Sequence, residues 1–376
     1  MIYYLGYYKS KYINDFTKSG SNAASFKMGY VIRALKDIGE RVKVVSWCPS
    51  DRMGRIPLRE VLVDEQQTEV YLPSFRIPKA PMRITAFFRN RALYRYFLRN
   101  VKKEDTVIVY HATSIAQALL KAKEKIGFKL ILEVEEIYHA DTKLRNREQI
   151  KVQEEALIAA ADSYIVVNDL IYDQYIHNGK PHMVLYGVYD GKEFTMKAEK
   201  RDERIQLLFS GSIDKVRGSE LAVEVAKHLP RNYCLNICGA GAPAYVDELT
   251  RKIQQHNQEA EGCEIIYHGQ LSEDDLDKLA LSCDIGLNLQ DILNPFEAVS
   301  FPSKITFYLQ HGLNVVSTKM SSVLASKLAG NVIFGESSAI AMSEAIEQTV
   351  LKDKESNMRV MKDLDTNAHE ALRNLI

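Results

Sequence analysis

A proline, a serine and a lysine stand together where a helix is expected to begin. Pro302 and Ser303 favour a helix start, and Lys304 lies in the first turn of a helix predicted over residues 304–311. A cation there opposes the helix dipole, which costs roughly a few tenths of a kcal/mol unless an anion is bound. A diphosphate would supply that anion; the alternative is a plain amphipathic helix whose lysine points to solvent.

A second anion site is indicated where a predicted strand, residues 205–210, ends at Gly211. A loop with Lys215 and Arg217 follows and leads into a helix. Backbone N–H groups and the helix dipole favour an anion at such a turn. The two basic side chains could add charge-assisted bonds to a phosphate. The alternative is an ordinary strand–turn–helix with solvated basic residues.

Acidic residues and a histidine stand at two other predicted strand ends. Glu133 and Glu135 share one side of an extended strand, and Glu136 faces away. A carboxylate there could orient a hydroxyl or accept its proton. His111 follows another strand, at the carboxyl end where sites gather in open α/β sheets. A solvated loop and a structural histidine are the alternatives.

Short apolar strands alternate with longer amphipathic segments, which predicts βαβ units and parallel sheets. The first half is expected to hold strands at 2–7, 42–47, 106–110, 129–134 and 163–167, with helices at 22–38, 114–125 and 148–161. After a polar interval, 190–204, strands are expected at 205–210, 234–238, 264–267, 285–289 and 314–317, with helices at 220–229, 246–255, 273–282, 304–311 and 339–351. The fold class is therefore α/β, with two doubly wound halves.

The composition bounds the partners and the compartment. The 376 residues suit two domains, and 49 basic against 49 acidic residues argue against nucleic acid. Five widely spaced cysteines read as free thiols in a reducing compartment, and Cys234 and Cys238 lack a second pair for zinc. The N-terminus lacks signal-peptide features and no segment is apolar enough to span a membrane, so we expect a cytoplasmic protein.

Residues 75–103 carry nine Lys or Arg and no Asp or Glu, interleaved with aromatic and aliphatic side chains. Such a stretch is typical of a surface that binds anionic lipid. The alternative is a core helix with an exposed basic face.

Four segments in order resemble glycosyltransferase family 4, the group 1 glycosyltransferases. Ser303-Lys304 after proline, with Tyr308, Gly312 and an apolar strand, is similar to that family's "PSK…Y…G.PVV" segment. The other three matches are Phe209-Ser210-Gly211 with Arg217-Gly218, Cys238-Gly239-Ala240-Gly241, and His268-Gly269-Gln270-Leu271. Together they cover roughly residues 205–320.

The resemblance implies a GT-B fold, in which two Rossmann-like domains face across a cleft. We expect an acceptor domain over 1–190, a nucleotide-sugar domain over 191–355, and a helix over 356–376 that packs back on the first domain. The resemblance also implies retention of the anomeric configuration and no metal or other cofactor.

Carried over position by position, the resemblance implies a set of site residues. The donor diphosphate would be bound by Gly211, Ser212, Lys215, Arg217, Ser303 and Lys304, and the base by Gly239, Gln270 and Leu271. Gly20, Ser21 and Asn22 would lie on the acceptor side, where Asn22 is also simply a good N-cap, and His111, Glu135 and Glu297 are the catalytic candidates.

Two departures from the family weaken the catalytic assignment. The family's pair of glutamates would align with Val299 and Phe307, and its usual arginine with Ser212. Glu297, two residues before the first of these positions, is the candidate that could take over a contact with the donor sugar.

The sequence therefore predicts a hexosyltransferase that moves a sugar from a nucleotide-sugar to a sugar hydroxyl. The expected acceptor is a lipid-linked oligosaccharide in capsule, lipopolysaccharide or exopolysaccharide synthesis, reached as a peripheral protein through residues 75–103. One alternative is a nucleotide-sugar epimerase of the same fold. The other is a non-catalytic nucleotide-sugar-binding subunit, for which the missing glutamates are the argument.

Overall fold

The computed structural model divides the chain into two units. It describes residues 1–10, 12, 22–47, 54–76, 82–141, 144–189, 202–259, 262–293 and 297–376. Unit 1 comprises Met1–Val188 and Thr366–Ile376, and unit 2 comprises Tyr189–Asp365. Most of the expected polar interval, residues 190–201, lies outside the described residues.

Unit 1 is built on a sheet of eight strands in the order β10-β9-β8-β7-β1-β2-β5-β4. The strands are β1 (Ile2–Gly6), β2 (Val42–Ser46), β4 (Arg59–Leu62), β5 (Gln67–Tyr71), β7 (Thr106–Tyr110), β8 (Lys129–Val134), β9 (Ser163–Val166) and β10 (His182–Val184). All neighbours pair in parallel except β4, which runs antiparallel to β5. A separate antiparallel pair joins β3 (Gly54–Ile56) and β6 (Ser74–Arg76).

The central strands of unit 1 form where the sequence is continuously apolar. Leu5, Val107, Ile108 and Leu132 are fully buried. Strands buried on both faces read as unbroken apolar runs, which is why their positions could be predicted.

The strands between residues 54 and 76 were not predicted from the sequence. The side chains of β4 are mostly exposed, so no apolar pattern marks it. In β5, Gln67 and Glu69 are buried and bonded to each other, with Gln67 Nε2 donating to Glu69 Oε1 at 3.0 Å. Hydrogen bonding compensates these buried polar groups, but it leaves no hydrophobic signal in the sequence.

Unit 2 is built on a six-stranded parallel sheet in the order β13-β12-β11-β14-β15-β16. The strands are β11 (Ile205–Ser210), β12 (Tyr233–Cys238), β13 (Glu264–Tyr267), β14 (Ile285–Asn288), β15 (Asn314–Thr318) and β16 (Val332–Gly335). The strand order reverses between β11 and β14. In doubly wound sheets ligands bind beyond the carboxyl ends of the strands at this switch point.

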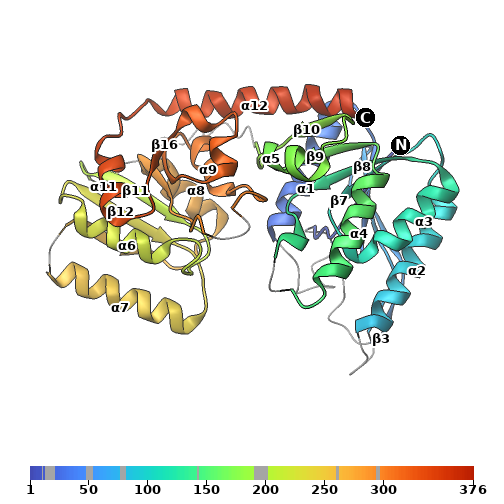
Figure 1. Ribbon diagram of the computed structural model, residues 1–376, viewed down its shortest axis with the longest axis horizontal. Coiled ribbons are helices and arrows are strands. Elements are labelled where there is room, and N and C mark those ends of the chain that lie inside the picture. The colour runs from blue at the N-terminus through green and yellow to red at the C-terminus, as the bar shows by residue number, and fades with distance from the viewer. Residues whose placement is uncertain are drawn as a thin grey trace. The chain divides into compact units, whose positions relative to one another are not determined.

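Helices connect the strands in both units (Figure 1). Unit 1 contains α1 (Asn22–Asp37), α2 (Met82–Asn100), α3 (Ala116–Ile126), α4 (Arg147–Ala160) and α5 (Asp169–Ile171). Unit 2 contains α6 (Ser219–His228), α7 (Pro243–Glu259), α8 (Glu273–Ser282), α9 (Ser303–Gln310), α10 (Ser321–Leu324) and α11 (Ala339–Glu347). The last helix, α12 (Lys354–Leu375), begins in unit 2 and ends in unit 1.

Two predicted properties can be compared with the described parts of the chain. None of its helices combines the length and apolarity that a membrane crossing requires. Cys234, Cys238, Cys263 and Cys283 are free and buried. Cys48 lies outside the described residues.

Glycines at the carboxyl edge of unit 2 allow backbone segments to meet. Gly239 has a φ of +146°, and a Cβ there would lie 1.7 Å from the carbonyl oxygen of Gly211. The N–H of Gly239 donates to the carbonyl of Gly269 at 2.8 Å. The turn after β12 is thus packed directly between the loops that follow β11 and β13.

We predict that Gly239→Ala destabilises unit 2 by about 3 kcal/mol or more, because both a positive φ and a backbone clash oppose the new side chain. Gly269→Ala is the matched control, since Gly269 has a φ of +68° but nothing within 4 Å of its Cβ position. It should cost only about 1 kcal/mol. Thermal unfolding measures both; equal effects would show that the close approach at Gly239 does not constrain the fold.

Candidate functional site

The candidate site of unit 2 lies at the switch point between β11 and β14. The loop of residues 211–218 follows β11, and residues 289–291 follow β14. The N-terminus of α9 adds Ser303, which is exposed, and Lys304. The structure thus gathers at one sheet edge the two segments that the sequence singled out for anion binding.

No residue in the described part of the chain forms a hydrogen bond or an ion pair with the Lys304 ammonium group. Its Nζ is buried and lies 3.8 Å from the centre of the Phe209 ring. Burial, reinforced by the nearby Arg217 guanidinium and opposed by the charge of Asp214, lowers the pKa of Lys304 to about 7. The aromatic ring offers partial compensation through a cation–π contact. A buried, unpaired cation of this kind is suited to receive an anion.

Tyr308 holds α9 against the end of β11. Its fully buried hydroxyl accepts from the Ser210 N–H at 3.0 Å and the Ser210 hydroxyl at 3.2 Å, and donates to the Leu287 carbonyl at 3.2 Å. The ring packs on Gly286, where a Cβ would lie 2.2 Å from it. Tyr308 therefore fixes the turn at Gly211 relative to Lys304, one helical turn away.

Gly211 brings the backbone close to that lysine. Its φ is +127°, and a Cβ there would lie 3.0 Å from Lys304 Cε. Ser212, Lys215 and Arg217 of the same loop are exposed. The Arg217 guanidinium donates to Gln290 Oε1 at 3.0 Å, and its backbone N–H donates to Asp214 at 2.8 Å.

The residues expected to bind a base lie on the neighbouring turns. Gly239 follows β12, while the exposed Gln270 and the half-buried Leu271 follow β13. The hydroxyl of Tyr267 donates to the Gly239 carbonyl at 3.0 Å, which ties the two turns together. Their contact with a base stays a prediction.

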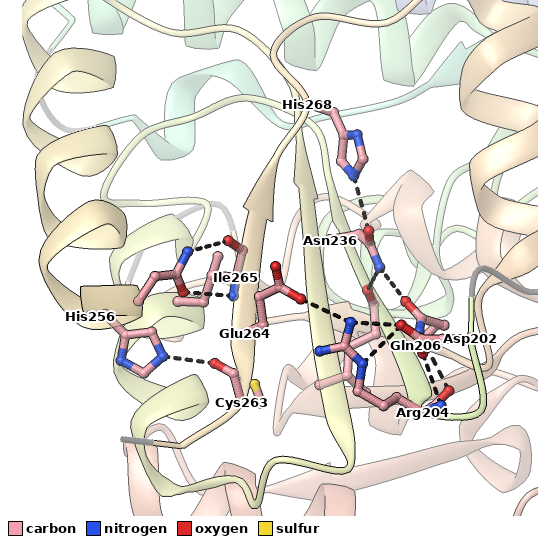
Figure 2. A network of polar contacts seen from close by, with 11 residues as sticks. Asp202, Arg204, Gln206, Asn236, His256, Cys263, Glu264, Ile265 and His268 are labelled. Carbon is pink, nitrogen blue, oxygen red and sulfur yellow. Dashed lines mark hydrogen bonds and ion pairs between the residues drawn. The ribbon is translucent and has the colours of Figure 1, made fainter. Parts of the chain in front are cut away.

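A polar network anchors this edge to the opposite end of the sheet (Figure 2). His268 Nε2 lies 2.9 Å from Asn236 Oδ1, and the Asn236 amide donates to Gln206 Oε1 at 3.1 Å. Gln206 donates in turn to Asp202, and Arg204 bridges Asp202 and Glu264. Because the Asn236 amide nitrogen is used as a donor, its oxygen faces His268, which must donate from Nε2.

Glu297 is engaged by the backbone of α10. Its carboxylate accepts from the N–H groups of Ser321 and Ser322, and the residue is buried. Burial raises the pKa of Glu297 above its usual value, against the effect of those two hydrogen bonds. The geometry shows a helix cap; the contact with a donor sugar stays a prediction.

The carboxyl edge of unit 1 holds two neighbouring carboxyl groups, those of Glu133 and Glu135. Burial, together with Glu135, raises the pKa of Glu133, whose carboxyl also accepts from the Tyr4 hydroxyl. Glu135 is paired with Lys27 at 3.4 Å and is the more exposed of the two. A carboxyl group at this edge could accept the proton of a reacting hydroxyl group.

His111 is buried beside this pair. Its Nδ1 lies 2.9 Å from the Glu136 carbonyl and its Nε2 3.1 Å from Glu154 Oε1. Burial lowers the pKa of His111, although Glu154 opposes this. Glu154 also faces His139 Nδ1 at 2.5 Å. Both ring nitrogens of His111 thus lie near protein oxygens, and its catalytic role stays a prediction.

The acceptor-side segment cannot be placed. Gly20 and Ser21 lie outside the described residues, and Asn22 is placed only as the first residue of α1.

Sequence reasoning missed two residues of these edges. Glu154 is a fully buried carboxylate on the face of α4 that also buries Leu157 and Ile158; an acid within an apolar stripe was the available signal. Gln290, 2% exposed, carries no such signal because it follows β14 in an irregular segment.

Comparison with known proteins finds a family model that matches the C-terminal part of the chain. Residues 191–366 match the sequence model of the glycosyl transferases group 1. No curated protein has a sequence similar enough to match this chain.

Solved structures share the fold of both units. Sucrose-phosphate synthase from Thermosynechococcus elongatus has a TM-score of 0.63 at 14% identity, covering 100% of this chain and 94% of its own. Anabaena HepE in complex with UDP has a TM-score of 0.65 at 14% identity, covering 100% of both chains. A UDP-forming α,α-trehalose-phosphate synthase from Burkholderia xenovorans, in complex with glucose-6-phosphate, has a TM-score of 0.63 at 14% identity, covering 96% of this chain and 95% of its own.

These similar structures are GT-B glycosyltransferases, so the expected fold is confirmed. The residues of unit 2 that are predicted to bind an anion lie within the matched segment. The chain has the GT-B fold, and its residues 191–366 match the sequence model of the group 1 glycosyltransferases.

Proposed function

We propose that this protein transfers a hexose from a nucleoside diphosphate sugar to a sugar hydroxyl. Lys304 carries the proposal, because a buried ammonium without a counter-ion is costly to keep unless a ligand compensates it. Lys304 and Arg217 would bind the diphosphate, and the turns at Gly239 and Gln270 the base. Anabaena HepE, which has the same fold, has been solved with UDP and glucose, consistent with this class of donor.

Electrostatics supply the chemistry in this proposal. The leaving diphosphate gains negative charge as the sugar departs, and preorganised cations at that position lower the barrier. The described residues include no group of three or more His, Cys, Asp and Glu placed to hold a metal. Metal independence remains part of the proposal, and it is tested below with a chelator.

Glu135 is the proposed group for the acceptor hydroxyl. It is partly exposed at the carboxyl edge of unit 1, and its partner Glu133 is held toward the protonated form. Retention of configuration is proposed from the family resemblance alone. An epimerase would turn over donor without acceptor, so product analysis with donor alone distinguishes it. A binding subunit would bind donor and turn over nothing.

We predict that one of five nucleotides stabilises the protein in the presence of EDTA. UDP, GDP, CMP, dTDP and ADP are compared by thermal unfolding. A ligand at about 100 times its dissociation constant adds roughly 2.7 kcal/mol, which a shifted midpoint reveals. Absence of a shift with every nucleotide would contradict the proposal, and a shift abolished by EDTA would contradict metal independence.

We predict that Lys304→Met stabilises the nucleotide-free protein by about 1–3 kcal/mol, the usual cost of an unsatisfied buried polar group. The pKa of Lys304 is lowered to about 7 in the fold and is near 10.5 in an unfolded chain. Between these values the unfolded chain binds the extra proton, so wild-type stability rises with pH across this window. The gain from Lys304→Met is therefore largest at pH 7 and below, and shrinks above it.

The same variant should lose nucleotide binding. Wild-type affinity for the diphosphate should fall above pH 7, by up to about tenfold per pH unit, because only the protonated lysine binds. Lys304→Met should bind weakly and without this pH dependence. Lys278→Met, which removes an exposed lysine of α8, is the matched control and should change neither property. Unchanged affinity in Lys304→Met would refute the clamp.

The acceptor proposed for this enzyme is a lipid-linked oligosaccharide at an anionic membrane. The basic stretch of residues 75–103 contains α2, which buries Leu93 and Phe97 and exposes Phe87 and Phe88. Arg91, Arg95 and Arg99 are exposed along the same helix. The described side chains therefore combine an apolar end and a basic face, as interfacial helices do. Residues 77–81 lie outside the described residues.

We predict that the protein sediments with phosphatidylglycerol vesicles and not with phosphatidylcholine vesicles. Each basic residue near an anionic surface contributes about 1 kcal/mol, so changing Arg91, Arg95 and Arg99 to Gln should weaken binding roughly 100-fold. Changing Lys121, Lys125 and Arg373 to Gln removes the same charge from exposed positions elsewhere and is the control. Equal loss in both variants would mean that net charge, and not α2, drives binding.

A further inference from the structure

Residues 289–291 pair with the end of the 211–218 loop, position by position. Gly218 packs so closely that a Cβ there would lie 1.9 Å from the Leu289 carbonyl oxygen. The Asp291 N–H donates to the Val216 carbonyl at 2.9 Å. Between these two contacts, Gln290 meets Arg217. The loop that carries the diphosphate-binding arginine is therefore attached to the segment after β14.

Gln290 is itself held rigidly. It is 2% exposed, and its backbone carbonyl accepts from the Thr318 hydroxyl at 2.8 Å, which ties it to the end of β15. Its Oε1 accepts from Arg217 Nη1 at 3.0 Å. The amide nitrogen consequently presents two N–H donors, and no residue that the structure describes accepts from them. The side-chain amide of Gln290, in the segment that follows β14, thus has unused donors.

Gln290 binds Arg217 with an amide, although a carboxylate at this position would bind the guanidinium more strongly. A carboxylate would neutralise the guanidinium, whereas an amide oxygen orients it and leaves its charge in place. The Lys304 ammonium lies close enough to Arg217 for the guanidinium to lower its pKa. A neutral anchor therefore preserves two adjacent cations for an incoming dianion.

We propose that Gln290 is a positioning residue for the donor diphosphate, which orients Arg217 through Oε1 and offers its own amide N–H groups to a phosphate oxygen. This inference rests on the proposed function. It assigns to the segment after β14 a role in recognising the diphosphate part of the donor, whichever base is attached.

Calorimetric titration of UDP, GDP and ADP tests the proposal on wild type, Gln290→Glu and Gln290→Leu. Gln290→Glu should weaken every diphosphate that wild type binds by about tenfold or more, because a carboxylate repels the ligand and neutralises Arg217. Gln290→Leu leaves the Arg217 guanidinium free to move, so the ligand must order it on binding, which costs about 0.5–1.5 kcal/mol. The affinity for the diphosphate should therefore fall about two- to tenfold. The corresponding monophosphate should be affected less than the diphosphate.

Gln67→Leu is the matched control, since Gln67 is a buried amide of unit 1 that bonds Glu69. It should leave the affinities unchanged. Thermal unfolding confirms that each variant is folded, and Gln290→Glu keeps an acceptor for Arg217 should Gln290→Leu fail to fold. Wild-type affinity in a folded Gln290→Glu would overturn this inference alone. Failure of wild type to bind any diphosphate would overturn the proposed function and this inference with it.

Discussion

The uncompensated ammonium of Lys304 is the feature around which the carboxyl edge of unit 2 is organised. Tyr308 bonds α9 to Ser210, and Gly211 leaves room for the lysine stem. The Phe209 ring gives the Nζ its nearest favourable contact, at 3.8 Å. None of these contacts neutralises the charge, and Arg217 nearby makes it more costly. Keeping such a charge buried lowers the stability of the fold, and costs of this kind are concentrated at functional sites. At the switch point of a doubly wound sheet, an anionic ligand would compensate the charge.

Most of the fold could be predicted because strands of a parallel sheet that is buried on both faces appear in the sequence as continuous apolar runs. Strands such as β7, β8, β11 and β13 have the bounds that their apolar runs indicated. The prediction of strands failed where the buried side chains are polar and hydrogen-bonded, as at Gln67 and Glu69 in β5. It also failed where a strand is exposed, as in β4. Hydrophobic periodicity reports apolar burial only, so it detects neither the buried polar residues of β5 nor the exposed edge strand β4.

The candidate site was predictable to the extent that local sequence fixes it. Lys304 could be found because a cation is unfavourable in the first turn of a helix. Gln290 could not, because its meeting with Arg217 depends on the register between two segments that are 73 positions apart in the chain. His111 was found from its position at a strand end, but its neighbours could not be predicted. Its ring nitrogens lie near the Glu136 carbonyl and the Glu154 carboxylate, which come from segments 25 and 43 positions away in the chain, and its catalytic role stays a prediction.

The two sheet edges differ in how they treat charge, and the difference fits one reaction. In unit 2 the cations Lys304 and Arg217 are held by neutral groups, a ring and an amide, so their charge remains for a ligand. In unit 1 burial and the neighbouring Glu135 raise the pKa of Glu133, and Lys27 pairs with Glu135, so the two carboxyl groups carry less than their full negative charge. Under the proposed function the first arrangement stabilises a departing diphosphate, whose charge grows during transfer. The second arrangement, the carboxyl groups of unit 1, would accept a proton from a neutral acceptor hydroxyl while carrying only part of their negative charge. An edge with two free carboxylates would bind cations instead, and an edge with neutralised basic residues would bind no diphosphate.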